Sequence, residues 1–583
     1  MIKRSCELWS RFAAIAAPYW LSEKKRTAWT LLVLLIVLML GQVYSNVLFN
    51  QQTGELTSAL ADKDPARFWR TIYECLAMLV VAVPFWAAYP LVRDKLGINW
   101  RRWLTRRILD RYLGNRAYYE LNSNAEIDNP DQRIAEDVSI FTQKSLHYLL
   151  IILWSPIQVL AFSGVLWNIS PPLVCFLLLY AIVGTFVTTF LFGRVLIGLN
   201  YLQLKKEADF RFGLVRIREN AESIALYRGE AQELAQVEQR FESVYENNTK
   251  LVNRQFLLNL FGYAYNYLAI VIPYAVIASG VLSGELEVGV AVQAAGAFTA
   301  ILTALAIIID NFDGLSRFVA GIDRLDTFVK FLEVETPRRM ANRKIDVIQG
   351  KQLAISRLSL RTPDDKRWIV SGLTAVVRRG EGLMIRGPSG SGKSSLLRAI
   401  AGLASSGRGT IVRPDLKHML FLPQRPYMIL GSLRDQLLYP FAHRYYFDEE
   451  LLEILERVNL GRLANQFGGL DAEADWENVL SMGEQQRLAF ARVFIANPRY
   501  AMLDEATSAL DARNEERLYE LLSATPTTFV SVSHHDSVQK FHQNVLELVG
   551  DGRWQLHPAE QFCGAGLPSE TSLLLSTAMS PSS

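Results

Sequence analysis

Long hydrophobic runs crowd the first 310 residues of this chain, and mixed polar sequence fills the remainder. A helix needs about 20 apolar residues to cross a hydrocarbon core of about 30 Å. Six stretches reach or approach that length, although the second is free of charge only over residues 75–92 and has to extend back to residue 72. The pattern predicts six membrane-spanning helices, at about residues 28–50, 72–92, 146–168, 172–193, 255–284 and 288–309.

Each stretch alone is also compatible with a buried helix of a large soluble protein. Six of them within 310 residues favour a membrane domain, which we place at residues 1–335. The N-terminus is basic and no small-residue cleavage site follows the first run, so we expect an uncleaved helix there.

The basic residues predict the orientation of these helices. Six Lys or Arg residues precede the first span, and eight follow the second between Arg93 and Arg116. The short connections after the third and fifth spans, residues 169–171 and 285–287, carry no basic residue. Because Lys and Arg collect on the cytoplasmic side, both termini are expected there.

Two connections, Arg93–Ser145 and Arg194–Arg254, are long, charged and rich in helix-forming residues. We expect each to be a pair of helices that continue beyond the bilayer and meet at a turn. Asn122–Val138 supplies Asn, Asp and Pro for one such turn. After the sixth span a helix is expected to run on and end before Pro337.

The C-terminal part has the composition of a soluble α/β domain. A polar linker is predicted at residues 336–349, then short β-type runs that alternate with helical segments over 350–560. The last stretch, 561–583, is rich in Gly, Ser, Pro and Thr and is predicted to be disordered. The fold class is therefore a multidomain membrane protein: an all-α six-helix transmembrane domain followed by an α/β phosphate-loop domain.

Composition narrows the candidate functions further. The net charge of +3 does not suggest a nucleic-acid partner. The four cysteines are scattered without a CxxC motif, so neither a disulfide framework nor a thiolate metal site is expected.

GPSGSGKSS (Gly387–Ser395) fits the phosphate-binding pattern GxxxxGK[ST], between an apolar strand (GLMIR) and a helix. Glycines let backbone N–H groups approach phosphates, Lys393 neutralises the β and γ oxygens, and Ser394 offers a hydroxyl to Mg²⁺. The predicted nucleotide-binding residues are Gly387, Pro388, Ser389, Gly390, Ser391, Gly392, Lys393, Ser394 and Ser395.

YAMLDEATSALD (Tyr500–Asp511) is an apolar strand that ends in two carboxylates. We expect Asp504 to hold Mg²⁺ and Glu505 to orient and polarise the attacking water. Gln424 is suited to contact both Mg²⁺ and that water, and His534, after a further strand, to reach the γ-phosphate. Glu505, His534 and Gln424 are thus the predicted catalytic residues, with Ser394, Gln424 and Asp504 around the metal.

A second Ser-Gly turn lies in LSMGEQQRLAFAR (Leu480–Arg492) and opens a helix. A helix N-terminus is an anion site, but this one has neither a base nor a lysine of its own. The phosphate it meets is most simply one held by Lys393 of another copy.

LSMGEQQ resembles the signature motif of ABC-transporter ATPases. In that family two nucleotide domains enclose two ATP molecules, with the signature of one closing on the phosphate loop of the other. The resemblance implies that Ser481, Gly483 and Glu484 bind nucleotide in trans, that Asp511 belongs to the D-loop, and that His534 is the switch histidine.

PQRPYMILGSLRDQLLYP (Pro423–Pro440) resembles the equivalent segment of subfamily D, the peroxisomal fatty-acyl half-transporters. There a tyrosine in the position of Tyr439 stacks on adenine; Trp368 is the alternative in this chain. NPDQRIAEDV (Asn129–Val138) and RENAESIALYRGEAQE (Arg218–Glu233) resemble the family's two cytoplasmic-loop motifs. The branch also includes BacA/SbmA-type carriers and a mycobacterial cobalamin importer.

The resemblance implies a half-transporter that works as a homodimer in a lipid bilayer, with ATP and Mg²⁺ as cofactors and no obligatory binding protein. A bacterial plasma membrane is expected, with a peroxisomal-type organelle membrane as the alternative. The cargo is an amphipathic or hydrophobic solute, such as a fatty acyl compound, cobalamin or a peptide, and its direction stays open. Within GYAYNY, the residues Tyr263, Asn266 and Tyr267 are candidates for the cavity wall.

Two other functional classes share some of these motifs. A membrane-anchored ATPase that acts as an ATP-gated channel or regulator would keep the same motifs, but intact Glu505, Ser481 and His534 favour sustained turnover. A DNA-repair ATPase would lack the six spans and would need a long coiled coil between its two nucleotide motifs.

Overall fold

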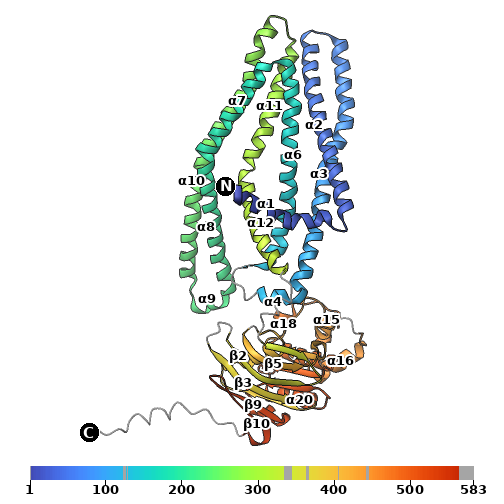
Figure 1. Ribbon diagram of the computed structural model, residues 1–583, viewed down its shortest axis with the longest axis vertical. Coiled ribbons are helices and arrows are strands. Elements are labelled where there is room, and N and C mark those ends of the chain that lie inside the picture. Colours follow the sequence, from blue (N-terminus) through green and yellow to red (C-terminus); the bar gives the residue numbers. More distant parts are fainter. Residues whose placement is uncertain are drawn as a thin grey trace, which may run out of the picture. The chain divides into compact units, whose positions relative to one another are not determined.

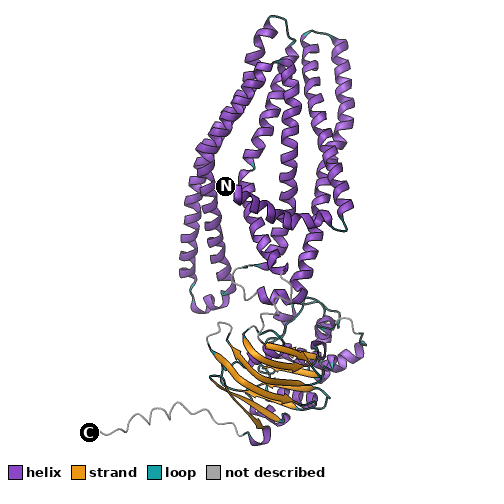
Figure 2. Ribbon diagram, in the orientation of Figure 1, coloured by secondary structure: helices purple, strands orange, loops and turns teal. Residues whose placement is uncertain are grey.

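The computed structural model describes residues 2–121, 127, 129–333, 345–362, 367–404, 406–441 and 445–562. The chain divides into two compact units, Met1–Glu335 and Thr336–Ser583. The first is helical, and the second combines strands and helices (Figures 1 and 2).

The first unit consists of long helices joined by short connections. In chain order they are α1 (Ile2–Leu21), α2 (Lys25–Ala61), α3 (Pro65–Leu113), η1 (Gly114–Arg116), α4 (Ala117–Leu121), α5 (Pro130–Gln132), η2 (Arg133–Asp137), α6 (Val138–Ile169), α7 (Pro171–Val187), η3 (Thr188–Gly193), α8 (Arg194–Glu219), α9 (Ala221–Tyr227), α10 (Glu230–Leu282), α11 (Val288–Asp310) and α12 (Phe312–Glu333).

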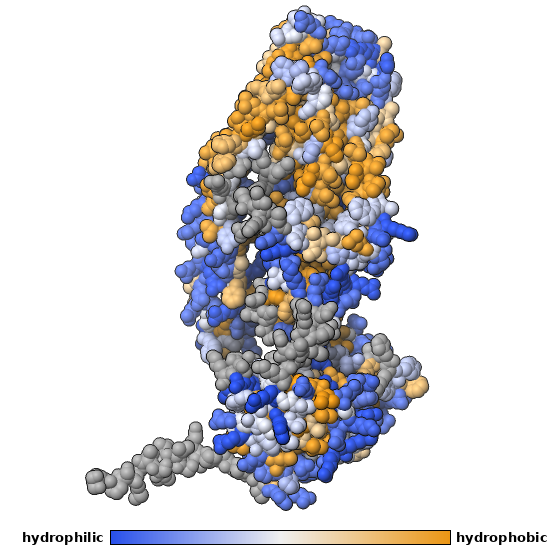
Figure 3. Space-filling view, viewed as in Figure 1, coloured by the Kyte–Doolittle hydropathy of each residue, from blue (hydrophilic) through white to orange (hydrophobic). Residues whose placement is uncertain are grey.

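Within the described residues, six helices are long and apolar enough to cross a membrane: Lys25–Ala61, Pro65–Leu113, Pro130–Ile169, Pro171–Gly193, Glu230–Leu282 and Val288–Ile307. Each overlaps one predicted span, and the last two end two residues before the predicted boundary. The helical membrane domain of the predicted fold class is confirmed. Large apolar side chains such as Val80, Leu160 and Ile182 are exposed on these helices, and Figure 3 shows the apolar surface that they form. Such a broad exposed apolar surface suits contact with lipid.

The two longest helices extend well beyond a bilayer core. At 1.5 Å per residue, the 49 residues of α3 span about 74 Å and the 53 residues of α10 about 80 Å. α8 and α10 lie side by side and are connected through α9 (Figure 1). The long connection Arg194–Arg254 is therefore a helical pair, whereas residues 122–126 and 128 of the other predicted turn lie outside the described part.

Small residues bring α11 close to its neighbours. A Cβ on Gly289 of α11 would lie 1.9 Å from the carbonyl oxygen of Gly54 on α2. Ala294, Ala297 and Ala304 of α11 are fully buried. Close approach through small side chains is the usual way in which membrane helices pack, and it makes α11 the centre of this unit.

Two features of this unit differ from the expected helices. The polar N-terminus forms a helix, α1, whose Tyr19 is buried and stacks on Trp100 of α3 at 5.6 Å. The helix expected to continue from the sixth span is interrupted at Asn311, between α11 and α12. The Asn311 amide donates to Ile307 O (2.7 Å) and its oxygen lies 3.0 Å from His147 Nε2, so local side-chain bonds accompany the break.

The second unit contains two sheets. The four-stranded sheet has the order β1-β5-β2-β3, and the six-stranded sheet β10-β9-β4-β8-β7-β6. The strands are β1 (Ile345–Gln349), β2 (Leu353–Arg361), β3 (Trp368–Val377), β4 (Gly382–Arg386), β5 (Gly407–Arg413), β6 (Met419–Leu422), β7 (Tyr500–Asp504), β8 (Thr528–Val532), β9 (Asn544–Gly550) and β10 (Arg553–Pro558).

Helices accompany the six-stranded sheet, as the predicted α/β class requires. They are α14 (Lys393–Ile400), η4 (Leu416–His418), α15 (Leu433–Leu438), α16 (Asp448–Arg457), α17 (Leu463–Phe467), α18 (Trp476–Val479), α19 (Met482–Ala496), α20 (Ala512–Ser523), η5 (Asp536–Phe541) and η6 (Ala559–Gln561).

The start of this unit differs from the predicted linker at 336–349. Residues 345–349 form β1, which pairs in parallel with β5, and Ile345 is buried. Residues 336–344 of the predicted linker, and residues 563–583 of the predicted tail, lie outside the described residues.

Candidate nucleotide site

The topology of the six-stranded sheet assembles the predicted site. β4, β8, β7 and β6 are neighbours and run parallel. Their carboxyl ends therefore meet at one edge, where ligands bind in sheets of this type. The phosphate loop follows β4, and His534 follows β8. Asp504 is the last residue of β7 and Glu505 comes directly after it, while Gln424 follows β6.

Two glycines give the phosphate loop its shape. Gly387 and Gly392 have φ of +149° and +95°, a region that other residues rarely adopt. A Cβ would lie 2.4 Å from Leu548 O in the first case and 2.1 Å from Ile369 Cγ2 in the second. The loop can thus pass close to the sheet and turn directly into α14, whose N-terminus faces an incoming anion.

Lys393 is drawn into this loop. Its side chain is buried, and Nζ donates to Gly387 O (2.9 Å) and Pro388 O (3.1 Å). Burial lowers the pKa of Lys393, while the nearby carboxylates of Glu505 and Asp504 act in the opposite direction. The Ser391 hydroxyl is also buried, and it has no hydrogen-bond partner among the described residues. The loop therefore offers a cation and a free hydroxyl to a phosphate.

Ser394 and Asp504 form a pair of hard oxygen ligands. Ser394 Oγ donates to Asp504 Oδ1 at 2.9 Å. Burial raises the pKa of Asp504, and the Ser394 hydrogen bond offsets part of that rise. A buried carboxylate gains most from a cation nearby, so this pair fits Mg²⁺. No cluster of three or more His, Cys, Asp or Glu side chains within the described ranges could hold a metal ion alone, and nucleotide oxygens would complete the coordination.

Glu505 is held between two polar side chains. Gln424 Nε2 donates to Glu505 Oε2 at 2.8 Å, and His534 Nε2 lies 3.4 Å from Glu505 Oε1. The Glu505 backbone has φ of +49°, which is uncommon for a residue with a side chain. Its N–H donates to Val532 O of β8 at 3.1 Å. The structure therefore brings the three predicted catalytic residues together.

The residues of the second turn form a capping box at the start of α19 within one chain. Their binding of nucleotide in trans stays a prediction. Ser481 is the N-cap of α19, and Glu484 Oε2 accepts hydrogen bonds from the Ser481 N–H (2.9 Å) and hydroxyl (2.7 Å). Gly483 packs on the loop that contains Ala509, and a Cβ added to Gly483 would lie 3.1 Å from Ala509 O. No hydrogen bond or ion pair among the described residues joins this cap to residues 387–395 of the same chain.

Comparison with known proteins agrees with this arrangement. A family model described as ABC transporter matches residues 370–508, and one described as ABC transporter transmembrane region 2 matches residues 16–282. An uncharacterized ABC transporter ATP-binding protein of Synechocystis sp. is 45% identical over 560 residues, which cover 94% of this chain and 85% of the relative. The chain belongs to the ABC transporter family.

Two further relatives of this ABC transporter carry more specific names. The chloroplastic ABC transporter D family member 2 of Arabidopsis thaliana is 38% identical over 608 residues, covering 93% of this chain and 86% of the relative. The lysosomal cobalamin transporter ABCD4 of Homo sapiens is 31% identical over 581 residues, covering 92% and 94%. The resemblance to subfamily D and its bacterial relatives is confirmed.

One connecting residue of the ABC transporter site was not predicted. Gln486, which is 1% exposed, donates to Gln424 O (3.1 Å) and to Ser508 Oγ (3.3 Å), and accepts from the Ala509 N–H (3.0 Å). It ties the signature helix α19 to the segment of Gln424 and to the D-loop. The only sequence signal for this role of Gln486 was its position, one turn into the helix that begins after Ser481.

Asp511, the predicted D-loop residue, caps α20. It accepts hydrogen bonds from the Asn514 backbone (2.9 Å) and side chain (2.6 Å), and these bonds lower the pKa of Asp511. The structure shows a cap for α20, and the assignment of Asp511 to the D-loop stays a prediction.

The two candidates for stacking on adenine lie in different surroundings. The Tyr439 ring lies 5.7 Å from that of Tyr427, and the Arg492 guanidinium lies 5.3 Å from its centroid. Trp368 begins β3, directly before the Ile369 that contacts Gly392, and the Arg361 guanidinium lies 4.1 Å from its ring. Both assignments stay predictions.

The membrane unit places the predicted cavity residues on an outer face of α10. Tyr263 and Tyr267 are 65% and 69% exposed, and Asn266 is exposed as well. None of them lines the cavities of about 760 and 340 Å³ in the membrane unit. Their contact with cargo stays a prediction.

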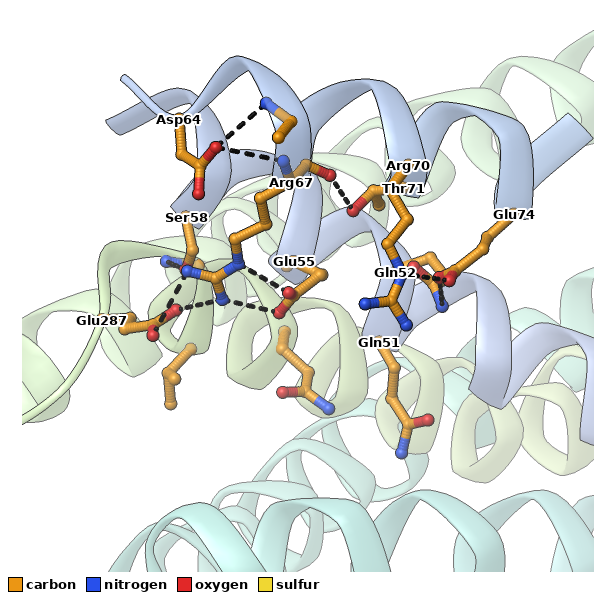
Figure 4. A pocket seen from close by; sticks show the side chains of 15 residues that line it. Gln51, Gln52, Glu55, Ser58, Asp64, Arg67, Arg70, Thr71, Glu74 and Glu287 are labelled. Atoms are coloured by element: carbon orange, nitrogen blue, oxygen red, sulfur yellow. Dashed lines mark hydrogen bonds and ion pairs between the residues drawn. The ribbon is translucent and has the colours of Figure 1, made fainter. Parts of the chain in front are cut away.

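A polar pocket of about 760 Å³ lies beside the turn between α2 and α3 (Figure 4). There Arg67 donates to Glu55 (2.7 and 2.9 Å) and to Glu287 (2.8 Å). The Ser58 hydroxyl accepts from the Gly289 N–H at 3.0 Å. These bonds connect the α2–α3 hairpin to the start of α11, and the bond from Arg67 is the main cause that lowers the pKa of Glu287.

Proposed function

We propose that this ABC transporter chain is one half of an ATP-driven transporter, in which two identical copies share two composite ATP sites. The observation that carries the proposal is the surroundings of Glu505. This residue directly follows Asp504, which bonds to Ser394, and its carboxylate contacts the side chains of Gln424 and His534. A site that only binds nucleotide has no need of a carboxylate in that position.

The side chains divide the work of hydrolysis. Lys393 exchanges its two carbonyl partners for β and γ oxygens, and the N–H groups at the start of α14 bind the same phosphates. Ser394 and Asp504 would hold Mg²⁺, which would supply positive charge to offset the charge on the transferred phosphoryl group. Glu505 accepts a hydrogen bond from the attacking water and orients it toward phosphorus, while His534 donates to a γ oxygen.

A second copy completes the site. The cap formed by Ser481 and Glu484 is exposed and is not joined to the phosphate loop of its own chain within the described part. In a two-fold symmetric dimer, each α19 N-terminus faces the nucleotide held by the other chain. Closure upon ATP and reopening after hydrolysis then drive the membrane units.

The cargo is proposed to be an amphipathic or hydrophobic solute. One relative is by name a cobalamin transporter, which supports a solute of this kind. Fatty acyl compounds, cobalamin and peptides are the classes to compare. The bacterial relative supports a plasma-membrane location, and the distribution of Lys and Arg supports cytoplasmic termini.

Glu505→Gln tests the enzymatic part. In proteoliposomes this variant should still bind ATP but should lose hydrolysis by 10²-fold or more and lose flux with it, as removal of one positioned group commonly does (about 10²–10⁴-fold). The matched control is Glu520→Gln at an exposed position of α20, which should change neither. Flux that persists without hydrolysis would instead indicate an ATP-gated channel.

A mixing experiment tests the composite site. Lys393→Ala and Ser481→Arg chains, each inactive alone, are co-expressed with different tags. Random pairing makes about half of the dimers mixed, and each mixed dimer keeps one intact site of two, so up to about one quarter of wild-type activity should return. Two differently tagged Lys393→Ala chains serve as the control and should stay inactive. No recovery in purified mixed dimers would contradict the shared sites.

A further inference from the structure

A buried carboxylate in the second unit has no part in the chemistry proposed above. Glu515 lies in the first turn of α20 and is 1% exposed. The Thr507 hydroxyl donates to its Oε1 at 2.7 Å, and the Ser537 hydroxyl donates to its Oε2 at 3.1 Å. Nδ1 of His535 lies 3.0 Å from Oε2 and 3.1 Å from Oε1. Both carboxylate oxygens of Glu515 are therefore bonded to side chains outside α20.

The partners of Glu515 belong to the two segments that carry the catalytic carboxylate and histidine. Thr507 lies two residues after Glu505, and His535 directly follows His534. The strands that lead into these segments, β7 and β8, are parallel neighbours. Glu505 Oε1 and His534 Nε2 lie 3.4 Å apart. Glu515 thus bridges the two segments within two residues, along the chain, of the side chains that meet.

Of these two catalytic side chains, His534 is the less firmly held. The Glu505 N–H donates to Val532 O at 3.1 Å, and the Glu505 carboxylate accepts from Gln424. The His534 side chain is 48% exposed, and among the described residues its only polar contact is the one to Glu505. The position of the ring therefore depends on the backbone of His534, whose oxygen accepts from Arg386 at 3.2 Å.

α20 gives Glu515 a firm support. Tyr519, one turn further along this helix, is 1% exposed and stacks on Phe541 of η5, with ring centroids 5.9 Å apart. η5 begins at Asp536, two residues after His534. Because close-packed side chains transmit a displacement rather than absorb it, α20 fixes the chain on which His534 lies.

We propose that Glu515 is a positioning residue for ATP hydrolysis, which keeps His534 in place beside Glu505. It acts through the residues that follow each of them and touches neither. Displacement of a catalytic group by about 1 Å can cost on the order of 10²-fold in rate. The inference rests on the proposed hydrolysis at this site and adds a residue that acts through its neighbours.

A double-mutant cycle distinguishes positioning from simple support of the fold. Glu515→Ala and His534→Ala are made singly and together in the full-length protein in proteoliposomes. Hydrolysis of radiolabelled ATP is followed in multiple and single turnovers, because single turnovers also measure rates far below that of the wild type.

Glu515→Ala should lower kcat about tenfold or more and change KM for ATP less than about threefold, because the phosphate loop is untouched. In the His534→Ala background the same change should lower kcat less than about threefold, because the side chain that Glu515 positions is gone. Glu515→Gln keeps the shape and part of the hydrogen bonding, so it should lose less than Glu515→Ala.

Leu522→Ala is the control for stability. Leu522 is buried on the same helix, two turns beyond Glu515. Its truncation leaves a cavity, so the thermal midpoint should fall. Below that midpoint kcat should stay within about twofold of the wild-type value, because no catalytic side chain moves. Glu520→Ala, at an exposed position of α20, should change neither quantity.

His535→Ala provides an independent measurement if Glu515→Ala does not fold. The His535 side chain is 47% exposed, so its removal disturbs the core little, yet it breaks one bond that ties Glu515 to the His534 segment. The variant should lower kcat without a matching rise in KM. Its effect should also shrink in the His534→Ala background.

Equal losses from Glu515→Ala with and without His534 would overturn the proposal. So would a wild-type kcat in Glu515→Ala, or a loss confined to KM. In each case hydrolysis that depends on Glu505 would leave the proposed function standing. Hydrolysis that ignores both Glu505 and His534 would instead contradict the proposed function itself.

Discussion

A buried histidine should make the second unit of this transporter sensitive to mild acid. His542 is 4% exposed and packs against Phe529, with ring centroids 5.1 Å apart. Its Nδ1 lies 2.8 Å from Val538 O, whereas Nε2 has no hydrogen-bond partner among the described residues. Burial lowers the pKa of His542 to about 4. The folded unit therefore holds this ring neutral.

The sign and size of the effect follow from proton linkage. In the unfolded chain the pKa of a histidine is about 6.5. Above that value both states are neutral and the full stability is present; as pH falls from about 6.5 toward 4, only the unfolded state takes up the proton. Between pH 8 and pH 5 this difference lowers the free energy of unfolding by about 2 kcal/mol.

Urea unfolding provides the measurement. The full-length protein in nanodiscs is unfolded at pH 8 and pH 5, and the intact fraction of the second unit is read by pulse proteolysis. With a urea m-value of about 2 kcal/mol/M, the share of the midpoint shift due to His542 is about 1 M. His542→Gln keeps a hydrogen-bond donor but does not titrate, so it should remove that share of the pH dependence, whatever its effect at pH 8.

The control is His557→Gln, at a partly exposed position of β10, which should leave the pH dependence as in the wild type. A His542→Gln chain with the full wild-type dependence on pH would refute the reasoning. It would mean that other groups, and not this ring, take up the proton upon unfolding.

Three further changes test other parts of the structure. Asp504→Asn should raise the urea midpoint of the nucleotide-free protein at pH 8. Burial raises the pKa of this carboxyl, so its charged form is unfavourable in the folded protein at that pH. The same variant should reduce the stabilisation measured with Mg²⁺ and ATP. Gly289→Ala should lower the thermal midpoint, since overpacking costs about 1–3 kcal/mol, whereas Gly262→Ala, which meets no atom within 4 Å, should not. Arg67→Leu should lower the thermal midpoint in low salt and lower it less in high salt. The loss should be larger than for Arg70→Leu, because Arg67 bonds several acids and Arg70 one.

The local chemistry of the nucleotide site could be predicted from the sequence because its motifs are continuous. A glycine-rich loop between a strand and a helix specifies a phosphate cradle, and an apolar strand that ends in Asp504 and Glu505 specifies a carboxylate edge. The six spans could be predicted for a similar reason, because a charge-free run of about 20 residues is long enough to cross a bilayer as one helix. In each case one segment carries the whole signal.

Features that join separate segments could not be predicted in this way. Gln486 bonds to Gln424 and to the D-loop across 62 and 22–23 positions of sequence. The cavity lined by Asn50, Trp86 and Gln158 draws on three helices that share no motif. The break at Asn311 is accompanied by a hydrogen bond between its side chain and His147, 164 positions earlier in the sequence.

The hydrogen bonds around Glu505 and Gln486 suggest how cargo transport and hydrolysis are linked inside one chain. The side-chain amide of Gln424 donates to Glu505, and the backbone oxygen of Gln424 accepts from Gln486. Gln486 also donates to Ser508 Oγ, at the start of the D-loop. A shift of the segment that carries Gln424 would therefore move the carboxylate and the D-loop together. Because ABC transporters couple a membrane unit to this ATPase unit, Gln486→Leu should lower ATP turnover while ATP binding persists. The matched Gln466→Leu at an exposed site of α17 should alter neither.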